Sequence, residues 1–265
     1  MPRITPLVSL LAAAFTALAA PTGQAADLQA EFVFLRNDSL FGTEWASIPF
    51  LSSNSNIEAT LTSPDQFSTA TTNQGSFNSS YASFQDLETA STNGPWALVI
   101  DPSGNPQNFD LNVSFPNFSE SLFGPVSLTS PTSLTNLPQS LLEFTWTGPS
   151  GYSTIDFILQ AEDFSLISYD TFAATQTAFT INSPLLEGNY RLTIRYVTEF
   201  TDAQVLVSGP EDAIDFASTG VNWSTPLVKA WSQGSFQLSV IPEPSTAILA
   251  GLGLCSFGLR RSRRA

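Results

Sequence analysis

Apolar and polar residues alternate along much of the chain between residues 27 and 240. Recurrence of apolar side chains at every second position predicts β-strands with one buried face. Runs of this kind cover residues 28–34, 57–62, 109–115, 142–146, 155–159, 192–196 and 235–240. The first run should end at Arg36-Asn37-Asp38-Ser39, whose residue types favour a turn. Because strand patterns dominate, the sequence predicts an all-β fold.

One short helix is predicted among these strands. It covers Phe84 to Ala90, with Ser83 as the N-cap residue and Asp86 three positions later. The continuous apolar run from Trp96 to Ile100 then predicts a strand that is buried throughout.

The strand patterns fall into two regions. Residues 26–124 form a β-rich N-terminal region, and residues 125–240 contain strands at the spacing of an antiparallel β-sandwich. The boundary is predicted near Pro125, in a polar segment over 117–138 that fits a linker and a pair of edge strands equally well. The sequence therefore leaves one domain or two open. Residues 201–233 are predicted to be an insertion or an extra hairpin before the closing strand.

Two features of the second region point to a known domain type. Trp146 ends an early strand before a Pro-Ser-Gly turn, and a Leu-x-Gly-x-Tyr run extends from Leu186 to Tyr190. In these features the region resembles a fibronectin type III or related immunoglobulin-like domain. The resemblance implies that Trp146 lies in the core. It also implies that Tyr190 is a tyrosine corner, whose hydroxyl bonds to nearby backbone.

The chain ends in three unlike elements. Pro242-Glu243-Pro244 should be extended, because proline lacks an amide donor and disfavours helix in the residue before it. The apolar residues 246–259 predict a transmembrane helix. The positive-inside rule keeps the basic end of the chain in the cytoplasm, so the soluble region faces out. That basic end consists of Arg260, Arg261, Arg263 and Arg264.

In this order the three elements resemble the PEP-CTERM sorting signal of exported proteins of Gram-negative bacteria. The resemblance covers residues 241–265. It implies that an exosortase, an integral membrane cysteine protease, recognises the tail as a substrate and cuts near the motif. It also implies transient anchoring in the inner membrane, followed by transfer to the cell surface or secretion. The alternative interpretation is a plain C-terminal anchor preceded by a proline-rich hinge.

The N-terminus independently predicts export. Residues 1–25 combine a basic start, an apolar segment from Ile4 to Ala20 and small residues at the end, which is the pattern of a signal peptide. We expect signal peptidase to cut after Ala25 or Ala26.

Charge and composition exclude several classes of function. Between Asp27 and Pro242 there are 22 acidic residues and four basic ones, so this region carries a formal charge of −18. A surface this acidic repels phosphate, and we expect no nucleic-acid partner. The chain has no histidine, and its single cysteine, Cys255, lies in the tail. Histidine-dependent catalysis and the usual zinc sites are thereby excluded, and we predict a protein without catalytic activity, metal or cofactor.

The strongest ligand candidates lie within residues 201–233, and each has a simpler interpretation. Glu211, Asp212 and Asp215 are close enough in sequence to ligate calcium or to act as an acid and base pair. Their spacing does not match the calcium-loop motif, and a solvated acidic turn is favoured. Trp223 and Trp231 could form an aromatic platform for a sugar ring, although packing in the core or at an edge is favoured.

Three hypotheses follow from the sequence. The leading one is an exported, noncatalytic β-sandwich protein of the cell envelope or extracellular matrix, processed by an exosortase and associated with exopolysaccharide or other surface proteins. The second is a carbohydrate-binding module acting on exopolysaccharide through exposed tryptophans and carboxylates. The third, and least favoured, is a carboxylate-based glycoside hydrolase.

Overall fold

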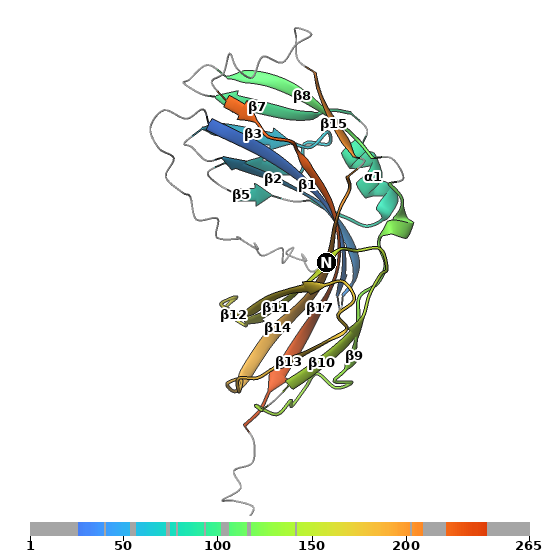
Figure 1. The fold of residues 1–265 in the computed structure, drawn as a ribbon, viewed down its shortest axis with the longest axis vertical. Helices are drawn as coiled ribbons and strands as arrows, with labels where there is room; N and C mark the ends of the chain where they lie inside the picture. The colour runs from blue at the N-terminus through green and yellow to red at the C-terminus, as the bar shows by residue number, and fades with distance from the viewer. Residues whose placement is uncertain are drawn as a thin grey trace, which may run out of the picture. The chain divides into compact units, whose positions relative to one another are not determined.

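The described part of the chain is built almost entirely of strands. The computed structural model describes residues 26–242 of the 265-residue chain, except 40, 54–56, 73–74, 78, 93, 102–105, 116–117, 141, 202 and 209–220. Its elements confirm the predicted all-β class (Figure 1). The predicted signal peptide (1–25) and transmembrane helix (246–259) lie outside the described residues. Within the described residues, no helix has the length and apolar character needed to cross a membrane.

The chain folds into two compact units. Of the described residues, unit 1 contains those up to Arg36, Thr43–Phe123 and Thr198–Trp231. Unit 2 contains Asn37–Gly42, Gly124–Val197 and the residues from Ser232 onward. This division differs from the contiguous regions 26–124 and 125–240 expected from sequence. In particular, the described residues of the predicted insertion (201–233) belong to unit 1 as far as Trp231.

Unit 1 contains two groups of paired strands. The first is a six-stranded sheet in the order β15-β8-β7-β3-β4-β5. Its strands are β3 (Glu58–Thr62), β4 (Thr69–Thr71), β5 (Gly75–Phe77), β7 (Trp96–Asp101), β8 (Gln107–Ser114) and β15 (Gln204–Ser208). In the second group, β1 pairs with β2, β2 pairs with β6, and β16 runs parallel to β1. These strands are β1 (Ala26–Ser39), β2 (Gly42–Ser53), β6 (Ser79–Tyr81) and β16 (Val221–Trp223).

Aromatic side chains fill the core of unit 1. Phe32 of β1 and Trp96 of β7 are fully buried, and their rings meet edge to face with centroids 5.0 Å apart. Within β7 the buried residues alternate with Ala97, which is exposed, so the prediction of a strand buried throughout is wrong. One face of the strand covers this core and the other does not.

The predicted helix is confirmed as α1 (Phe84–Thr92). The Asp86 amide donates to Ser83 Oγ over 3.2 Å, and that hydroxyl donates to the Asp86 carboxylate over 2.7 Å. The cap thus provides an acceptor for a backbone amide in the first turn, which has no partner within the helix. Leu87 is buried, and the Phe84 ring packs against Trp45 at 5.3 Å. A short 3₁₀ helix, η1 (Glu120–Leu122), follows later in this unit.

The turn predicted at Arg36–Ser39 is wrong, because β1 continues through these residues to Ser39. In unit 1, the Arg36 guanidinium donates to the Phe123 carbonyl over 3.1 Å and lies over the Trp45 ring. In unit 2, Asn37 Oδ1 accepts hydrogen bonds from Gln233 Nε2 (3.1 Å) and Ser235 Oγ (3.3 Å). These tertiary partners satisfy polar side chains that would otherwise favour a turn.

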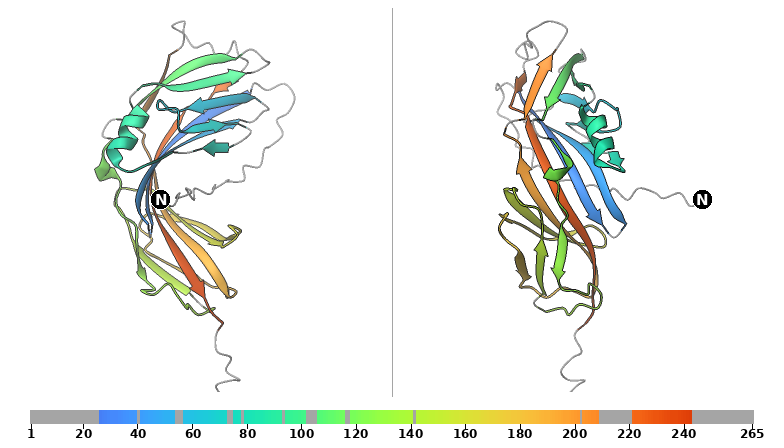
Figure 2. Two further views of the ribbon diagram at one scale, coloured as in Figure 1. Left: turned by 180° about the vertical axis from the view of Figure 1, so that it is seen from behind. Right: turned by 90° about the vertical axis from the view of Figure 1, so that its right-hand side faces the viewer.

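Unit 2 consists of two layers of antiparallel strands, which Figure 2 shows from behind and from the side. One layer has the order β12-β11-β14-β17, and the other has the order β13-β10-β9. The strands are β9 (Ser127–Ser130), β10 (Leu142–Thr147), β11 (Thr154–Ala161), β12 (Leu166–Ala173), β13 (Ala178–Ile181), β14 (Gly188–Glu199) and β17 (Leu227–Val240). The last two residues of β14 and the first five of β17 belong to unit 1.

The contacts implied by the fibronectin type III resemblance are present in unit 2. Trp146 is 1% exposed, with its ring 6.1 Å from that of Phe157 on β11. The Tyr190 hydroxyl donates to the Leu186 carbonyl over 2.8 Å, which is the hydrogen bond of a tyrosine corner. These contacts agree with the resemblance, while membership of that domain family stays a prediction.

The tyrosine corner predicts the effect of a single-atom change. Tyr190→Phe removes the donor to Leu186 and should lower the free energy of unfolding by about 1 to 1.5 kcal/mol. Urea unfolding of the exported protein would measure this change. In dilute, low-salt solution of the monomer, Tyr169→Phe, which alters an exposed tyrosine of the same unit, is the matched control and should change stability by less than about 0.5 kcal/mol. Equal effects of the two substitutions would contradict a structural role for the Tyr190 hydroxyl.

Tyr196 predicts a loss of stability in alkaline solution. Burial raises the pKa of its phenol above the ordinary value of 10.0, with the Trp146 side chain acting in the opposite direction. Because the folded-state pKa is the higher one, the associated stability is fully present below about pH 10 and is lost as the pH rises through the raised pKa. Tyr196→Phe should remove this part of the alkaline loss, as measured by unfolding free energies between pH 8 and pH 11. An unchanged pH dependence would contradict the assignment.

Candidate sorting site

The last strand of unit 2 ends in a set of backbone hydrogen bonds that we call the tail clasp. The clasp consists of Leu134, Leu137, Ser239 and Ile241. The Leu137 amide donates to the Ser239 carbonyl and the Ser239 amide donates to the Leu134 carbonyl, both over 2.8 Å. The Ile241 amide then donates to the Leu137 carbonyl over 3.0 Å, so that Leu137 lies in a parallel bridge with Val240. The segment around Leu137 thus holds β17 up to Ile241.

Burial changes abruptly at the clasp. Val240 and Leu137 are 1% and 5% exposed, whereas Ile241 is 40% exposed and Pro242 is also exposed. Proline has no amide hydrogen, so Pro242 cannot extend the hydrogen bonding by its own N–H. Strand β17 and the clasp therefore end directly before the predicted motif. Glu243, Pro244 and the four tail arginines lie outside the described residues.

Comparison with known families identifies what begins at this point. Residues 240–264 match the PEP-CTERM protein-sorting motif. The match indicates an exported protein that is sorted with the help of an exosortase, with transient anchoring in the membrane. It starts at Val240, the last residue of β17, and so overlaps the folded unit by the two residues that precede Pro242.

Comparisons beyond the motif give no further identification. The comparison with curated proteins gives no match. A structure titled "Biofilm associated protein - BSP domain" is 15% identical, with 83% of this chain and 30% of that chain covered and a TM-score of 0.23. A trypsin-activated alpha-2-macroglobulin from Escherichia coli is 12% identical, with 75% and 16% covered and a TM-score of 0.24. This chain spans less than a third of either structure, and TM-scores this low inform neither fold nor function.

The other candidate residues are only partly described. Glu211, Asp212 and Asp215 lie outside the described residues, and their role stays a prediction. Trp223 is half-buried on β16, opposite Leu28 of β1. Trp231 is half-buried on β17, with its ring 6.2 Å from that of Phe50. Part of each indole is therefore covered by the protein, and sugar binding by these rings also stays a prediction.

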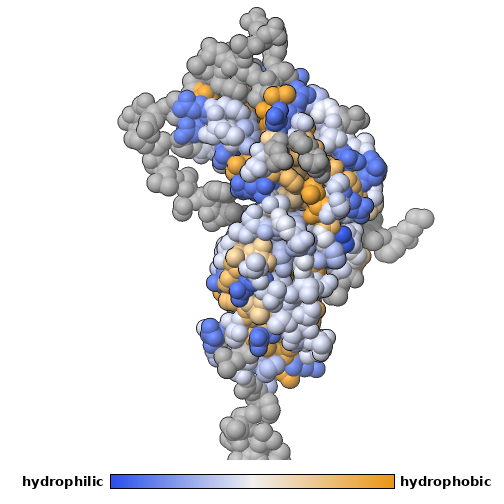
Figure 3. Space-filling view, turned by 45° about the vertical axis from the view of Figure 1, so that its right-hand side comes forward, coloured by the Kyte–Doolittle hydropathy of each residue, from blue (hydrophilic) through white to orange (hydrophobic). Residues whose placement is uncertain are grey.

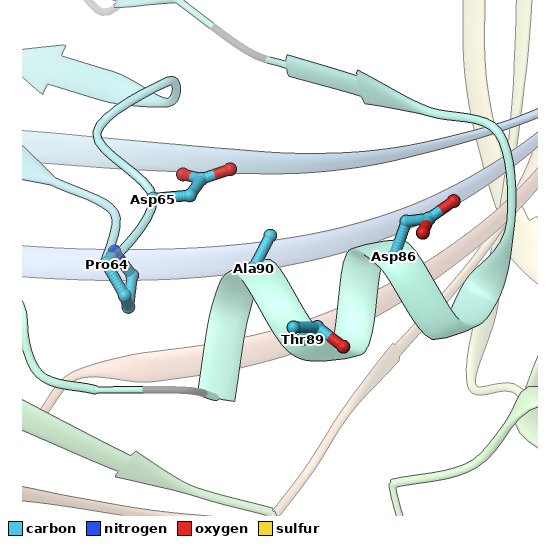
Figure 4. A pocket seen from close by; sticks show the side chains of 5 residues that line it. All are labelled: Pro64, Asp65, Asp86, Thr89 and Ala90. Carbon is cyan, nitrogen blue, oxygen red and sulfur yellow. The ribbon is translucent and has the colours of Figure 1, made fainter.

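Unit 1 contains a small pocket with two carboxylates. It encloses about 300 Å³ and is lined by Pro64, Asp65, Asp86, Thr89 and Ala90 (Figure 4). The carboxylate of Asp65 accepts hydrogen bonds from the Ser63 hydroxyl, the Phe67 amide (3.1 Å) and the Tyr81 hydroxyl (2.7 Å). Asp86 is engaged with Ser83 at the start of α1. Both carboxylates thus have structural roles, in the loop after β3 and at the helix start. Among the described residues there is no group of three or more metal-ligating side chains.

The sequence analysis missed the tail clasp. Leu134 and Leu137 lie in the polar segment over 117–138, which shows no strand periodicity. The available signal is a pair of leucines three positions apart among serine, threonine and proline. Such a pair identifies an apolar contact without identifying its partner, because the contact with β17 spans about a hundred residues of chain.

The clasp predicts the effect of removing one amide hydrogen. Ile241→Pro should release the end of β17, because it eliminates the hydrogen bond to the Leu137 carbonyl. One lost bond of about 1 kcal/mol corresponds to roughly fivefold faster hydrogen exchange at the Ser239 and Leu137 amides. Ile241→Ala keeps the amide and is the matched control, with exchange close to that of the unaltered protein. Equal exchange in the two variants would show that the Ile241 amide does not hold the strand.

Proposed function

We propose that this protein is an exported, noncatalytic component of the cell envelope or extracellular matrix, released or transferred by exosortase cleavage near Pro242, Glu243 and Pro244. The observation that carries the proposal is the position of the sorting motif. The motif match begins at Val240, the residue at which strand β17 ends. A protease acting just beyond Ile241 would leave β17 and the rest of the described fold intact.

The tail supplies the two other elements that such processing needs. Residues 246–259 are apolar and would hold the protein at the membrane until cleavage. Arg260, Arg261, Arg263 and Arg264 would keep the end of the chain in the cytoplasm, with both units outside. Signal peptidase would remove residues 1–25 on the same side of the membrane.

A noncatalytic role is supported by the composition of the chain. Without histidine, and with Cys255 placed in the tail, the protein has no residues for serine or cysteine nucleophile triads that use an imidazole base. Both carboxylates that line the described pocket, Asp65 and Asp86, accept hydrogen bonds from nearby groups of unit 1. The charge of −18 between residues 27 and 242 suits a protein that is soluble outside the cell.

Processing in the presence and absence of the enzyme tests the proposal. The full chain is expressed in a host with and without the cognate exosortase, beside a variant in which Pro242, Glu243 and Pro244 are all alanine. We expect the tail to be lost only when enzyme and motif are both present, as a mass difference of about 2 to 3 kDa between intact and mature protein.

A matched control tests whether the loss of the tail depends on the motif itself. Ile241→Ala changes the residue before the motif but leaves Pro242, Glu243 and Pro244 in place, and it should be processed like the unaltered chain. Retention of the whole tail in every strain would mean that the protein is an ordinary C-terminally anchored one.

A further inference from the structure

The longest exposed sheet edge of unit 2 is strand β12. Among the described residues it pairs with β11 alone and ends its layer in the strand order, so its other side is an open edge within the described part of that layer. β12 is eight residues long, whereas the two edge strands of the opposite layer, β13 and β9, have four residues each. An edge of this length presents a row of backbone donors and acceptors to any strand that pairs with it.

Few features along this edge would block pairing with a strand of another chain. Natural edge strands are commonly blocked by lysine, proline or very short length, and residues 162–173 contain neither lysine, arginine nor proline. The register shift opposite Leu159 and Gln160 skips only Ile167, so the pairing with β11 is regular from Ser168 to Ala173. Leu166, Ile167 and Tyr169 are 59%, 48% and 51% exposed, respectively. Figure 3 shows one face of the molecule, on which hydrophobic patches lie among hydrophilic residues.

The turn before β12 fixes the start of the edge. The Asp163 carboxylate accepts hydrogen bonds from the Ser165 hydroxyl (2.6 Å) and the Ser165 amide (3.0 Å), which lower the pKa of this carboxyl. The Ala161 amide donates to the Ser165 carbonyl over 2.9 Å, closing the hairpin. A strand held in this way is preorganised, so that pairing costs little further conformational entropy.

Side-chain hydrogen bonds connect β12 to the next two strands of its sheet, β11 and, through it, β14. Thr171 Oγ1 donates to Asp156 Oδ1 over 3.0 Å. The buried Asp156 also accepts from Arg195 Nε and Nη2 at Oδ2, over 3.0 and 2.6 Å. Because Asp156 lies opposite both Thr171 and Arg195 in the strand register, this row ties three strands together.

We propose that β12 is a self-association edge, at which a second copy of this chain adds its own β12 in antiparallel orientation. The occupant is argued from the strand's own residues. A two-fold symmetric pair in one continuous sheet must centre on a single residue, and the registers that overlap residues 166–173 most fully centre on Tyr169 or on Asp170. Centring on Asp170 places two carboxylates directly opposite each other, which is unfavourable.

Centring on Tyr169 gives complementary neighbours instead. Tyr169 then lies opposite Tyr169 of the second copy, and Ser168 lies opposite Asp170. Within one chain the Ser168 hydroxyl donates to the Asp170 carboxylate over 2.7 Å, and its single proton can be donated to the carboxylate of either chain, so this pairing leaves neither group without a partner. Ile167 and Thr171 form the next pair on the exposed face. The acidic turn residues Glu162 and Asp163 fall opposite Gln176 and Thr175, so no two like charges oppose each other between residues 162 and 176.

The net charge determines how this association responds to salt. Two acidic chains repel each other over distances comparable to the Debye length, which is about 10 Å at 0.1 M ionic strength and about 3 Å at 1 M. The apolar and backbone contacts at the edge are far less sensitive to salt. We therefore expect the dimer fraction to rise with sodium chloride concentration, in contrast to an assembly held by ion pairs.

Cysteine pairs test the register directly. In a Cys255→Ser background, Tyr169→Cys places the two thiols opposite each other across the symmetry axis, with Cβ atoms about 4.5 to 5.5 Å apart. Thr171→Cys lies on the same strand and face, but its two copies are offset by four residues, or about 13 Å. Mild oxidation should therefore give a disulfide-linked dimer at least about tenfold faster for Tyr169→Cys than for Thr171→Cys.

Sedimentation of the exported protein tests association without a cross-link. The unaltered chain should show a concentration-dependent dimer, and Tyr169→Lys should weaken dimerisation at least about tenfold, because two ammonium groups would meet at the axis. Leu206→Lys, on the edge strand β15 of unit 1, is the matched control and should leave dimerisation unchanged. A protein that stays monomeric in 1 M salt, or equal cross-linking of Tyr169→Cys and Thr171→Cys, would overturn the proposal.

Discussion

Burial of aromatic side chains between layers of strands is the interaction on which the rest of the structure depends. The sequence offers no intradomain disulfide and no histidine-bound metal, so stability must come from packing and backbone hydrogen bonding. In unit 1 Phe32 meets Trp96, and in unit 2 Trp146 meets Phe157. Each contact joins strands of different sheets within its unit. Aromatic rings suit this task because one side chain removes a large apolar area from water.

Polar residues that lie within strands are accommodated by specific partners. Asn37 accepts two hydrogen bonds from β17, and the buried pair of Asp156 and Arg195 is completed by Thr171. A buried charge pair of this kind is costly to break, because removal of either partner leaves an uncompensated charge. These interactions set the register of strands whose apolar residues alone would tolerate alternatives.

Specific backbone hydrogen bonds also determine where the last strand ends before the sorting motif. Strand β17 is buried on alternate residues up to Val240, and the tail clasp around Leu137 holds it as far as Ile241. Pro242, Glu243 and Pro244 therefore follow directly after the clasp in the sequence. Cleavage beyond Ile241 would leave every buried residue of the described part of the chain in place.

Several elements could be predicted from the sequence because their signals are local. The capping pair of Ser83 and Asp86 placed α1, and alternation located β8, β10 and β11. The residues Leu186 to Tyr190 indicated a tyrosine corner, and the hydrogen bond is present. The sorting motif could be identified from order and position alone, because its three elements follow one another in the sequence.

Other features depended on distant residues and could not be predicted in this way. Strand β2 contains Pro49, which argues against a strand, yet β6 pairs only with Trp45 to Ser47 and leaves Pro49 beyond its end. The polar residues at the end of β1 favoured a turn until Gln233 and Ser235 supplied partners from far along the chain.

The sequence by itself therefore determined the all-β class, the sorting motif and the local caps, since each of these depends on neighbouring residues. Only the tertiary structure decided which segments belong to each unit, where β1 and β17 end and which edge stays open. Those outcomes depend on pairing between residues separated by tens to hundreds of positions. The alternation of apolar and polar residues predicts a strand but does not identify its partner.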